Sequence, residues 1–405
     1  MCDVRGGAVE ALYERLRAAA GLQSGDGAVR VVAEYEPVGG PGSPIFPPTV
    51  KVKATDAAGY LVEPRWVDGQ QVDVVLLDQR QSQANRCETA LLAAIEREGT
   101  FIPHLALSTQ AAGVDVRVTS LEAPHRSRDA YFRDAMDADN QPFDKTEAGA
   151  GLQAASAGDL RAYLRWVPSD LVYGVWDSHR KRRIQVKIPR AYSSEMVGVA
   201  PLAGKRAAGR MDPLNLPGEV VQVTSSGWQF TDSAKKNTKD KSQAKLSELG
   251  HGMIPPSEGL GGVAVKAVQR TATLSMAQLA GLRFGDASPE FCAAGRALVG
   301  AVALLGDRLA FAAPAIRLRS GCDLVLVSER IEWVGRGLDG RPATEPLELA
   351  SPEQARALFE VAVARAEAAG VEWPKKAVEL QPAPGLQEAI RRSFEVTGIG
   401  ESESE

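Results

Sequence analysis

Histidine and cysteine are scarce in this sequence, which limits the chemistry that the chain can perform. Only four of its 405 residues are histidines and four are cysteines. No two cysteines are close enough in sequence to form a CxxC unit, and this argues against both a zinc site and a disulfide framework. We therefore expect scattered free thiols, no metal and no cofactor. The cysteines are Cys2, Cys87, Cys292 and Cys322.

Long apolar runs and standard catalytic motifs are also missing. No stretch reaches the roughly 20 apolar residues that a membrane helix needs, and the N-terminal residues lack the apolar centre of a signal peptide. The sequence contains no HExxH and no GxSxG pattern. These absences predict a cytoplasmic protein with no membrane partner and no catalytic residues.

The positive charges of the chain are concentrated in its middle. Residues 161–275 hold 18 Lys and Arg against 9 Asp and Glu, although the net charge of the whole chain is −4. A basic stretch inside an acidic chain is typical of a local polyanion-binding groove. A solvated basic loop region would give the same distribution.

Strand-like and helix-like segments alternate irregularly, which favours an α+β fold over a doubly wound sheet. Apolar periodicity and capping residues define the expected elements. Ser288 and Pro289, and likewise Ser351 and Pro352, are placed to begin helices. The expected strands are 29–35, 72–78, 114–120, 170–176, 183–188, 262–270 and 322–334. The expected helices are 8–20, 80–98, 126–137, 288–311, a short one from Ser275 and a final one from Ser351.

Three clusters of basic and polar residues are candidate phosphate contacts. The first opens helix 80–98, where free N–H groups and the helix dipole favour phosphate. The second follows His125, and the third runs from Trp176 into strand 183–188, whose basic residues alternate on one face. Ordinary solvated helix faces would explain the first two equally well. The candidates are Arg80, Ser82, Gln83, Asn85, Arg86; His125, Arg126, Arg128, Arg133; and Ser178, His179, Arg180, Arg182, Arg183, Lys187.

Aromatic and glycine-rich segments supply further candidates. We expect Trp176 in the core, and Trp228 as a stacking surface for bases beside the mobile lysine-rich loop with Lys235, Lys236 and Lys239. The segment 251–262 contributes His251, Gly259, Gly261 and Gly262, where the backbone can approach a ligand or another chain closely. It is neither a dinucleotide fingerprint nor a P-loop.

Read together and in this order, several blocks resemble the backbone subunit of type I-G CRISPR interference complexes, formerly type I-U. The resemblance spans about 45–330. Its most specific parts are SQANR followed by Glu88, and VWDSH with its basic tail. The blocks are FPPT (46–49), LLDQRQSQANRCE (76–88), HRSRDAYFRD (125–134), YGVWDSHRKRR (173–183) and HGMIPPSEGLGGV (251–263).

The resemblance implies a fold of the RAMP superfamily. It implies an RRM-like, ferredoxin-type core at 25–340 with a basic finger and thumb insertion at about 140–270. Strand 72–78 and helix 80–98 would be the first pair of the core, and helix 288–311 and strand 322–334 the last. Residues 341–405 would form a helical extension that ends in a disordered acidic tail.

The resemblance also implies a function. Such subunits stack head to tail along CRISPR RNA without cutting it, and the guide then pairs with target DNA. The implied partners are CRISPR RNA, target DNA through the guide, further copies of the chain and other subunits of the complex. Related subunits of type III complexes cleave RNA with a loop aspartate, and Asp232 and Asp240 lie in the lysine-rich loop. Two alternatives stay open: a metal-independent endoribonuclease that uses His125, His179 or His251, and a protein scaffold without nucleic acid.

Overall fold

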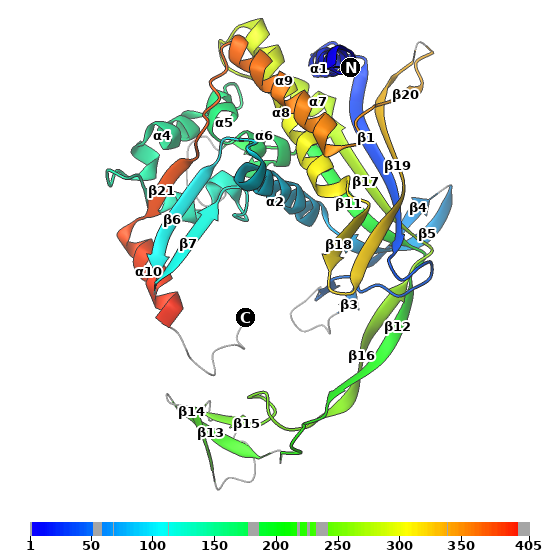
Figure 1. Cartoon of the computed structure of the whole chain (residues 1–405), viewed down its shortest axis with the longest axis vertical. Coiled ribbons are helices and arrows are strands. Elements are labelled where there is room, and N and C mark those ends of the chain that lie inside the picture. Colours follow the sequence, from blue (N-terminus) through cyan, green and yellow to red (C-terminus); the bar gives the residue numbers. More distant parts are fainter. Residues whose placement is uncertain are drawn as a thin grey trace.

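The computed structural model describes residues 2–51, 59–67, 69–111, 113–176, 186–216, 219–224, 227–231, 242–337 and 339–395. It is a mixed α+β fold with insertions, as the sequence predicts (Figure 1). The helices in this part of the chain are α1 (Cys2–Ala19), α2 (Arg80–Glu98), α3 (Ala130–Arg133), α4 (Glu147–Ala154), α5 (Arg161–Trp166), α6 (Pro168–Tyr173), α7 (Met276–Ala280), α8 (Pro289–Phe311), α9 (Pro352–Ala368) and α10 (Pro384–Glu395), with 3-10 turns η1 (Arg126–Arg128) and η2 (Phe143–Lys145).

One curled antiparallel sheet forms the centre of the molecule. Its strands lie in the order β18-β19-β1-β17-β11-β5-β4, and β20 pairs with β19. The alternation of β1 explains its place: Val29, Val31, Ala33 and Tyr35 are buried on one face, while the residues between them are more exposed. The strands are β1 (Asp26–Pro37), β4 (Val62–Val67), β5 (Gln70–Asp78), β11 (Tyr192–Val199), β17 (Ala267–Ser275), β18 (Ala315–Arg319), β19 (Cys322–Arg336) and β20 (Pro342–Pro346).

Four of these strands and two helices follow one another in the order of a ferredoxin-type unit. Along the chain they are β1, α2, β11, β17, α8 and β19, and in space the strands lie as β19-β1-β17-β11. The expectation that strand 72–78 is the first strand of this unit is wrong. That strand, β5, lies outside it between β11 and β4, because the first central position is taken by β1.

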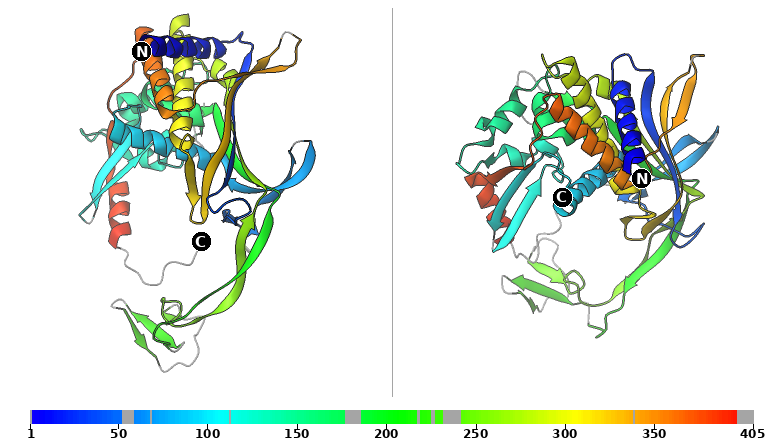
Figure 2. Two further views of the ribbon diagram at one scale, coloured as in Figure 1. Left: turned by 45° about the vertical axis from the view of Figure 1, so that its right-hand side comes forward. Right: turned by 45° about the horizontal axis from the view of Figure 1, so that its top comes forward.

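Helices α1, α2, α8 and α9 cover one face of the sheet and enclose the main core (Figure 2). Helix α8 is central and almost wholly buried along its length from Ala294. Its length and apolar composition would suffice to cross a membrane, but most of it is buried inside the protein. Core burial accounts for its apolarity.

The capping residues predict the helix boundaries well. Ser288 caps α8 by accepting a hydrogen bond from the Phe291 N–H at 3.1 Å, and Pro289 is the first helical residue. Ser351 and Gln354 form the predicted capping box of α9. Gly99 ends α2 in the left-handed conformation, with a φ of 72°.

The predicted helix 126–137 is wrong. The segment contains η1, then α3, then the strand β8 (Ala135–Met136). Arg126 has a φ of +52°, and Asp129 is extended and caps α3 through the Tyr131 N–H. Inward contacts of the side chains of Arg126 and Ser127 hold this broken conformation.

The predicted strand 170–176 is also wrong for most of its length. Pro168 begins α6, and Gly174, with a φ of +80°, ends it before the short strand β9 (Val175–Trp176). A short apolar run fits a buried helix as well as a buried strand, so periodicity did not separate them. Likewise, the predicted strand 262–270 spans the end of β16 (Ile254–Ala264) and the start of β17.

Two structures project from the central sheet (Figures 1 and 2). One is a lobe with α4, α5, α6 and a four-stranded sheet ordered β7-β6-β21-β8. The other is a long two-stranded arm, β12 with β16, which leads to a small sheet ordered β14-β13-β15. The remaining strands are β2 (Thr49–Val50), β3 (Gly59–Tyr60), β6 (Leu105–Ala111), β7 (Val114–Thr119), β10 (Lys187–Ile188), β12 (Leu202–Arg210), β13 (Val220–Thr224), β14 (Gly227–Phe230), β15 (Gln243–Lys245) and β21 (Val378–Pro382).

The segment after residue 340 contributes to both the centre and the lobe. Helix α9 packs against α8 and α1. Strand β21 pairs with β6 in parallel and with β8 antiparallel, and thereby completes the sheet of the lobe. Residues 341–395 are therefore integrated with the rest of the fold.

Candidate nucleic-acid interface

The start of α2 is organised around one buried carboxylate, Asp78. Ser82 Oγ, Gln83 Nε2 and Arg86 Nε donate to its two oxygens at 2.6, 2.6 and 2.7 Å. Arg86 also donates to the carbonyls of Arg317 and Leu318 on β18, at 3.2 and 2.8 Å. The most specific sequence block thus joins α2 to two strands of the sheet.

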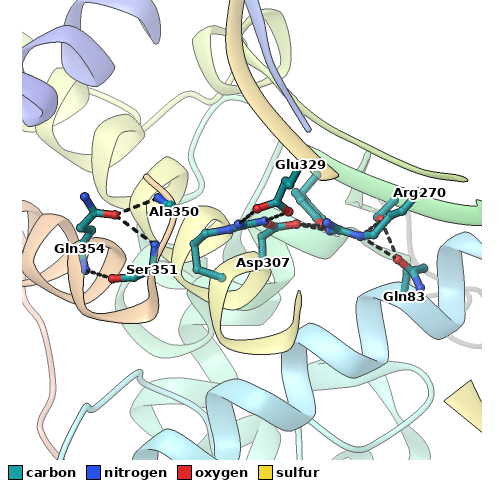
Figure 3. A network of polar contacts seen from close by, with 10 residues as sticks. Gln83, Arg270, Asp307, Glu329, Ala350, Ser351 and Gln354 are labelled. Carbon is teal, nitrogen blue, oxygen red and sulfur yellow. Dashed lines mark hydrogen bonds and ion pairs between the residues drawn. The ribbon is translucent and has the colours of Figure 1, made fainter. Parts of the chain in front are cut away.

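Gln83 also takes part in a buried polar network (Figure 3). Its Oε1 accepts hydrogen bonds from Ser194 Oγ at 2.6 Å and from Arg270 Nε at 3.3 Å. Arg270 pairs with Asp307, and Arg308 joins Asp307 to Glu329. We call Arg270, Asp307, Arg308 and Glu329 the buried charge network. It connects strands β17 and β19 with helix α8, so Gln83 is engaged inside the protein.

The buried charge network keeps Asp307 ionised. Burial alone would raise the pKa of this carboxyl, but the positive charges of Arg270 and Arg308 outweigh burial and hold its pKa well below the usual range. Each buried charge therefore has an opposite charge beside it.

Two residues of the first cluster remain at the surface. Arg80 is 61% exposed and lies 3.7 Å from Glu195, measured from Nε to Oε2. Asn85 is exposed on the outer face of α2. Of the five candidates in this cluster, these two are the most accessible to a ligand.

The second cluster likewise contains residues that bind inside the protein and residues that remain exposed. Arg126 is buried and donates to both oxygens of Glu88, from Nε at 2.6 Å and from one terminal nitrogen at 2.8 Å. Arg128 donates to Tyr163 Oη at 2.9 Å and to the Leu152 carbonyl at 2.6 Å. His125 is exposed, and so is Arg133, which pairs with Asp134 at 2.7 Å.

A pocket of about 440 Å³ forms where the second and third sequence blocks meet. Its lining comes from residues 124–126, 173–176 and 187–190. We call it the β9–β10 pocket. Gly174 is needed there, since a Cβ at this position would lie 2.9 Å from the Ile188 carbonyl oxygen.

The rim of the β9–β10 pocket combines an aromatic ring with cations. Trp176 is 52% exposed, so our expectation of a core position for it is wrong. Lys187 places its Nζ 5.2 Å from the centroid of the Trp176 ring. His125 lines the same pocket.

Arg190 differs from the other arginines near the pocket. Its Nε donates to the Tyr173 carbonyl at 3.2 Å, and no carboxylate among the described residues pairs with it. Burial lowers the pKa of Arg190, and the positive charge of Arg126 lowers it further. The negative charge of Glu88 opposes this, and Arg80 adds the smallest lowering effect. The pocket therefore holds a guanidinium that no carboxylate of the described residues contacts directly.

Burial raises the pKa values of two carboxyl groups that bind the second cluster, Glu88 and Asp170. Burial raises the pKa of Glu88 to about 7, although Arg126 opposes this rise. Burial also raises the pKa of Asp170 to about 6, against the hydrogen bond from Ser127. Neither carboxyl pairs with Arg190.

The arm carries the glycine-rich and aromatic candidates. At its far end, the Trp228 ring lies 5.6 Å from Phe230 and 5.8 Å from His251, measured between centroids. All three residues are exposed. Trp228 and Phe230 belong to β14, so this accessible aromatic cluster lies on the small sheet at the end of the arm (Figure 1).

Two of the three candidate glycines of the arm allow close packing within this chain. A Cβ on Gly261 would lie 2.7 Å from the Gly204 carbonyl carbon, and one on Gly262 would lie 2.7 Å from Pro44 Cβ. Gly259 has open space around it. The close backbone approach that we expected at 261 and 262 occurs within this chain.

Several candidates lie outside the described residues. They are Ser178, His179, Arg180, Arg182 and Arg183 after β9, and Lys235, Lys236 and Lys239 with Asp232 and Asp240 in the lysine-rich loop. Trp176 and Lys187 flank the first of these gaps.

Sequence reasoning missed Arg190 and misplaced Trp176. Arg190 follows Pro189 directly after the basic strand pattern, and it breaks the alternation that drew attention to that strand. Trp176 ends an apolar run and precedes Asp177, and this polar boundary was a usable signal of exposure. Arg126 pairs with Glu88, whereas Arg190 has no carboxylate partner among the described residues. No sequence pattern indicates this difference.

Residues 29–201 match the model of a family described as CRISPR-associated protein GSU0053 (Cas_GSU0053). This similarity supports a CRISPR-associated protein. The matched region runs from β1 to the end of β11, and it includes the start of α2 and the whole β9–β10 pocket. The arm and the glycine-rich block lie beyond it. No curated protein matches the chain.

Proposed function

We propose that this chain is a non-catalytic backbone subunit of a type I-G CRISPR interference complex and binds the guide RNA. The observation that carries the proposal is the β9–β10 pocket, with a cation that lacks a carboxylate partner in the described part of the chain beside a half-exposed tryptophan. Cations bind phosphate and aromatic rings stack on bases, and neither contact depends on sequence. Such contacts suit a protein that must hold any guide.

The assembly follows from the same proposal. Copies of the chain would lie along one CRISPR RNA, together with other subunits, and the guide would reach target DNA by base pairing. Base pairing then reads the sequence while the protein reads the backbone, a division known from another CRISPR effector. The exposed arm, with Lys205 and Arg206 on β12, extends away from the sheet (Figure 1), and in the proposed assembly it would be available to such neighbours.

Binding of labelled single-stranded RNA tests the proposal. Fluorescence anisotropy with several unrelated sequences should give similar dissociation constants, and the affinity should fall steeply with salt because phosphate contacts release counterions. Arg182→Glu combined with Arg183→Glu should weaken binding of all sequences alike. Selective loss for one sequence, or no RNA binding at all, would contradict the proposal.

One observation favours the alternative of an endoribonuclease. His125 lines the same pocket as Lys187 and Arg190, so an acid-base residue lies beside cations that could hold a phosphate. Incubation with CRISPR repeat RNA in EDTA separates the two functions. Intact RNA supports the binding subunit, whereas specific cleavage that His125→Ala abolishes would establish the nuclease.

A further inference from the structure

The β9–β10 pocket has the composition of a site for one nucleotide. We infer that it takes a single nucleotide of single-stranded RNA, with the phosphate at Arg190 and Lys187 and the base against Trp176. This inference rests on the proposed function and assigns a particular subsite to it.

The phosphate position follows from the unused donors of Arg190. A guanidinium has five N–H donors, and Arg190 uses only its Nε in the described structure. Arg126 has a larger electrostatic effect on Arg190 than the nearby carboxyl of Glu88, which is already paired with Arg126. A group with negative charge and several acceptor oxygens would satisfy these donors, and a phosphate is such a group.

The base position follows from Trp176. The ring is half-exposed and lies at the rim of the pocket, and the Nζ of Lys187 is close to the ring. Stacking of a base on an aromatic ring is tolerant of base identity, because every base presents a π face. The pocket volume of about 440 Å³ falls within the range of small-ligand sites.

A set of substitutions tests the two halves of the site separately. Binding of a short labelled RNA is compared with binding of the same RNA made abasic throughout. Trp176→Ala should weaken binding of the intact RNA about 5- to 100-fold and have little effect with the abasic RNA. Arg190→Gln should weaken binding of both RNAs by about tenfold or more and reduce the salt slope by about one.

Matched controls lie elsewhere on the surface. Trp66 on β4 is 76% exposed and Arg341 is 86% exposed, so Trp66→Ala and Arg341→Gln remove the same groups outside the pocket. Both should bind RNA as the unmodified chain does. Trp176→Phe keeps a stacking ring and should retain most of the affinity. Thermal unfolding of each variant establishes that it is folded.

The outcomes distinguish the subsite from the proposed function. Absence of RNA binding by the unmodified chain overturns the proposed function and the subsite with it. RNA binding that persists undiminished in folded Trp176→Ala or Arg190→Gln overturns the subsite alone. Equal loss in Trp176→Ala with intact and abasic RNA overturns the stacking role.

Discussion

The buried charge network and the β9–β10 pocket each contain two arginines from different parts of the chain, but the two regions differ in whether every arginine has a carboxylate partner. In the network, Arg270 and Arg308 flank Asp307, and Arg308 also pairs with Glu329. In the pocket, Arg190 has no carboxylate partner in the described part of the chain. The first arrangement holds strands and helices together, and the second is suited to an external anion. A basic residue becomes a candidate contact for a ligand when no carboxylate of the protein pairs with it directly.

The largest expected effect comes from breaking the network. Asp307→Asn leaves two buried arginines without their shared partner, which should lower the free energy of unfolding by about 3–5 kcal/mol. Urea denaturation measures this change. The matched control is Asp339→Asn, whose exposed partner Arg341 is 3.9 Å away, and it should cost less than about 1 kcal/mol. Equal effects of the two substitutions would contradict the distinction between buried and exposed pairs.

The pH dependence of stability should reveal the same network. The pKa of Asp307 is lowered in the folded protein, so its contribution to stability is fully present above the unfolded pKa of about 3.9. It declines below that pH and is lost as the pH falls through the lowered pKa of the folded state. The stability difference between the unmodified chain and Asp307→Asn should therefore be large at neutral pH and shrink at about pH 3. Denaturation curves at several pH values measure it, and a difference that is constant with pH would contradict this account.

An intermediate effect is expected at the start of α2. Arg86→Ala removes hydrogen bonds to Asp78 and to two carbonyls of β18, so it should lower the free energy of unfolding by about 1.5–3 kcal/mol. Arg97→Ala, in the exposed last turn of the same helix, should change it by less than about 0.5 kcal/mol. Loss of RNA affinity in Arg86→Ala without loss of stability would make Arg86 a ligand contact instead.

The smallest effect is expected on the arm. Arg206 is exposed and its guanidinium lies 5.8 Å from the centroid of the Phe46 ring. Because it is one exposed charge, Arg206→Gln should weaken RNA binding by less than about threefold, with no change in stability. Anisotropy titration beside Arg190→Gln measures the ratio. A loss as large as that of Arg190→Gln would move the main contact to the arm.

Sequence patterns predicted the regular parts of the fold and failed where side chains turn inward. The limits of α2 and the cap of α8 depend on local chemistry, and Gly99, Ser288 and Pro289 indicated them correctly. The helix prediction for 126–137 failed because Arg126 and Ser127 bind partners far away in sequence, Glu88 and Asp170. Tertiary contacts of this kind override helical periodicity.

The candidate site was predictable only as a region. Basic and polar residue types identified the blocks around 80, 125 and 180. The first block forms the start of α2, and the described parts of the second and third meet at the β9–β10 pocket. Within each block, the sequence could not separate Arg126, which neutralises Glu88, from surface residues such as His125. Charge balance depends on which segments become neighbours, and the sheet order determines that.

The most direct test of RNA binding without cleavage is the nucleic acid that accompanies the protein. The chain is expressed together with a CRISPR array and a separate nuclease that processes the array transcript. It is purified without nuclease treatment, and its bound RNA is sized and sequenced. The account predicts RNA of uniform length with guide sequences of every kind in the array. Protein free of RNA, or RNA cut at one site only when His125 is intact, would contradict it.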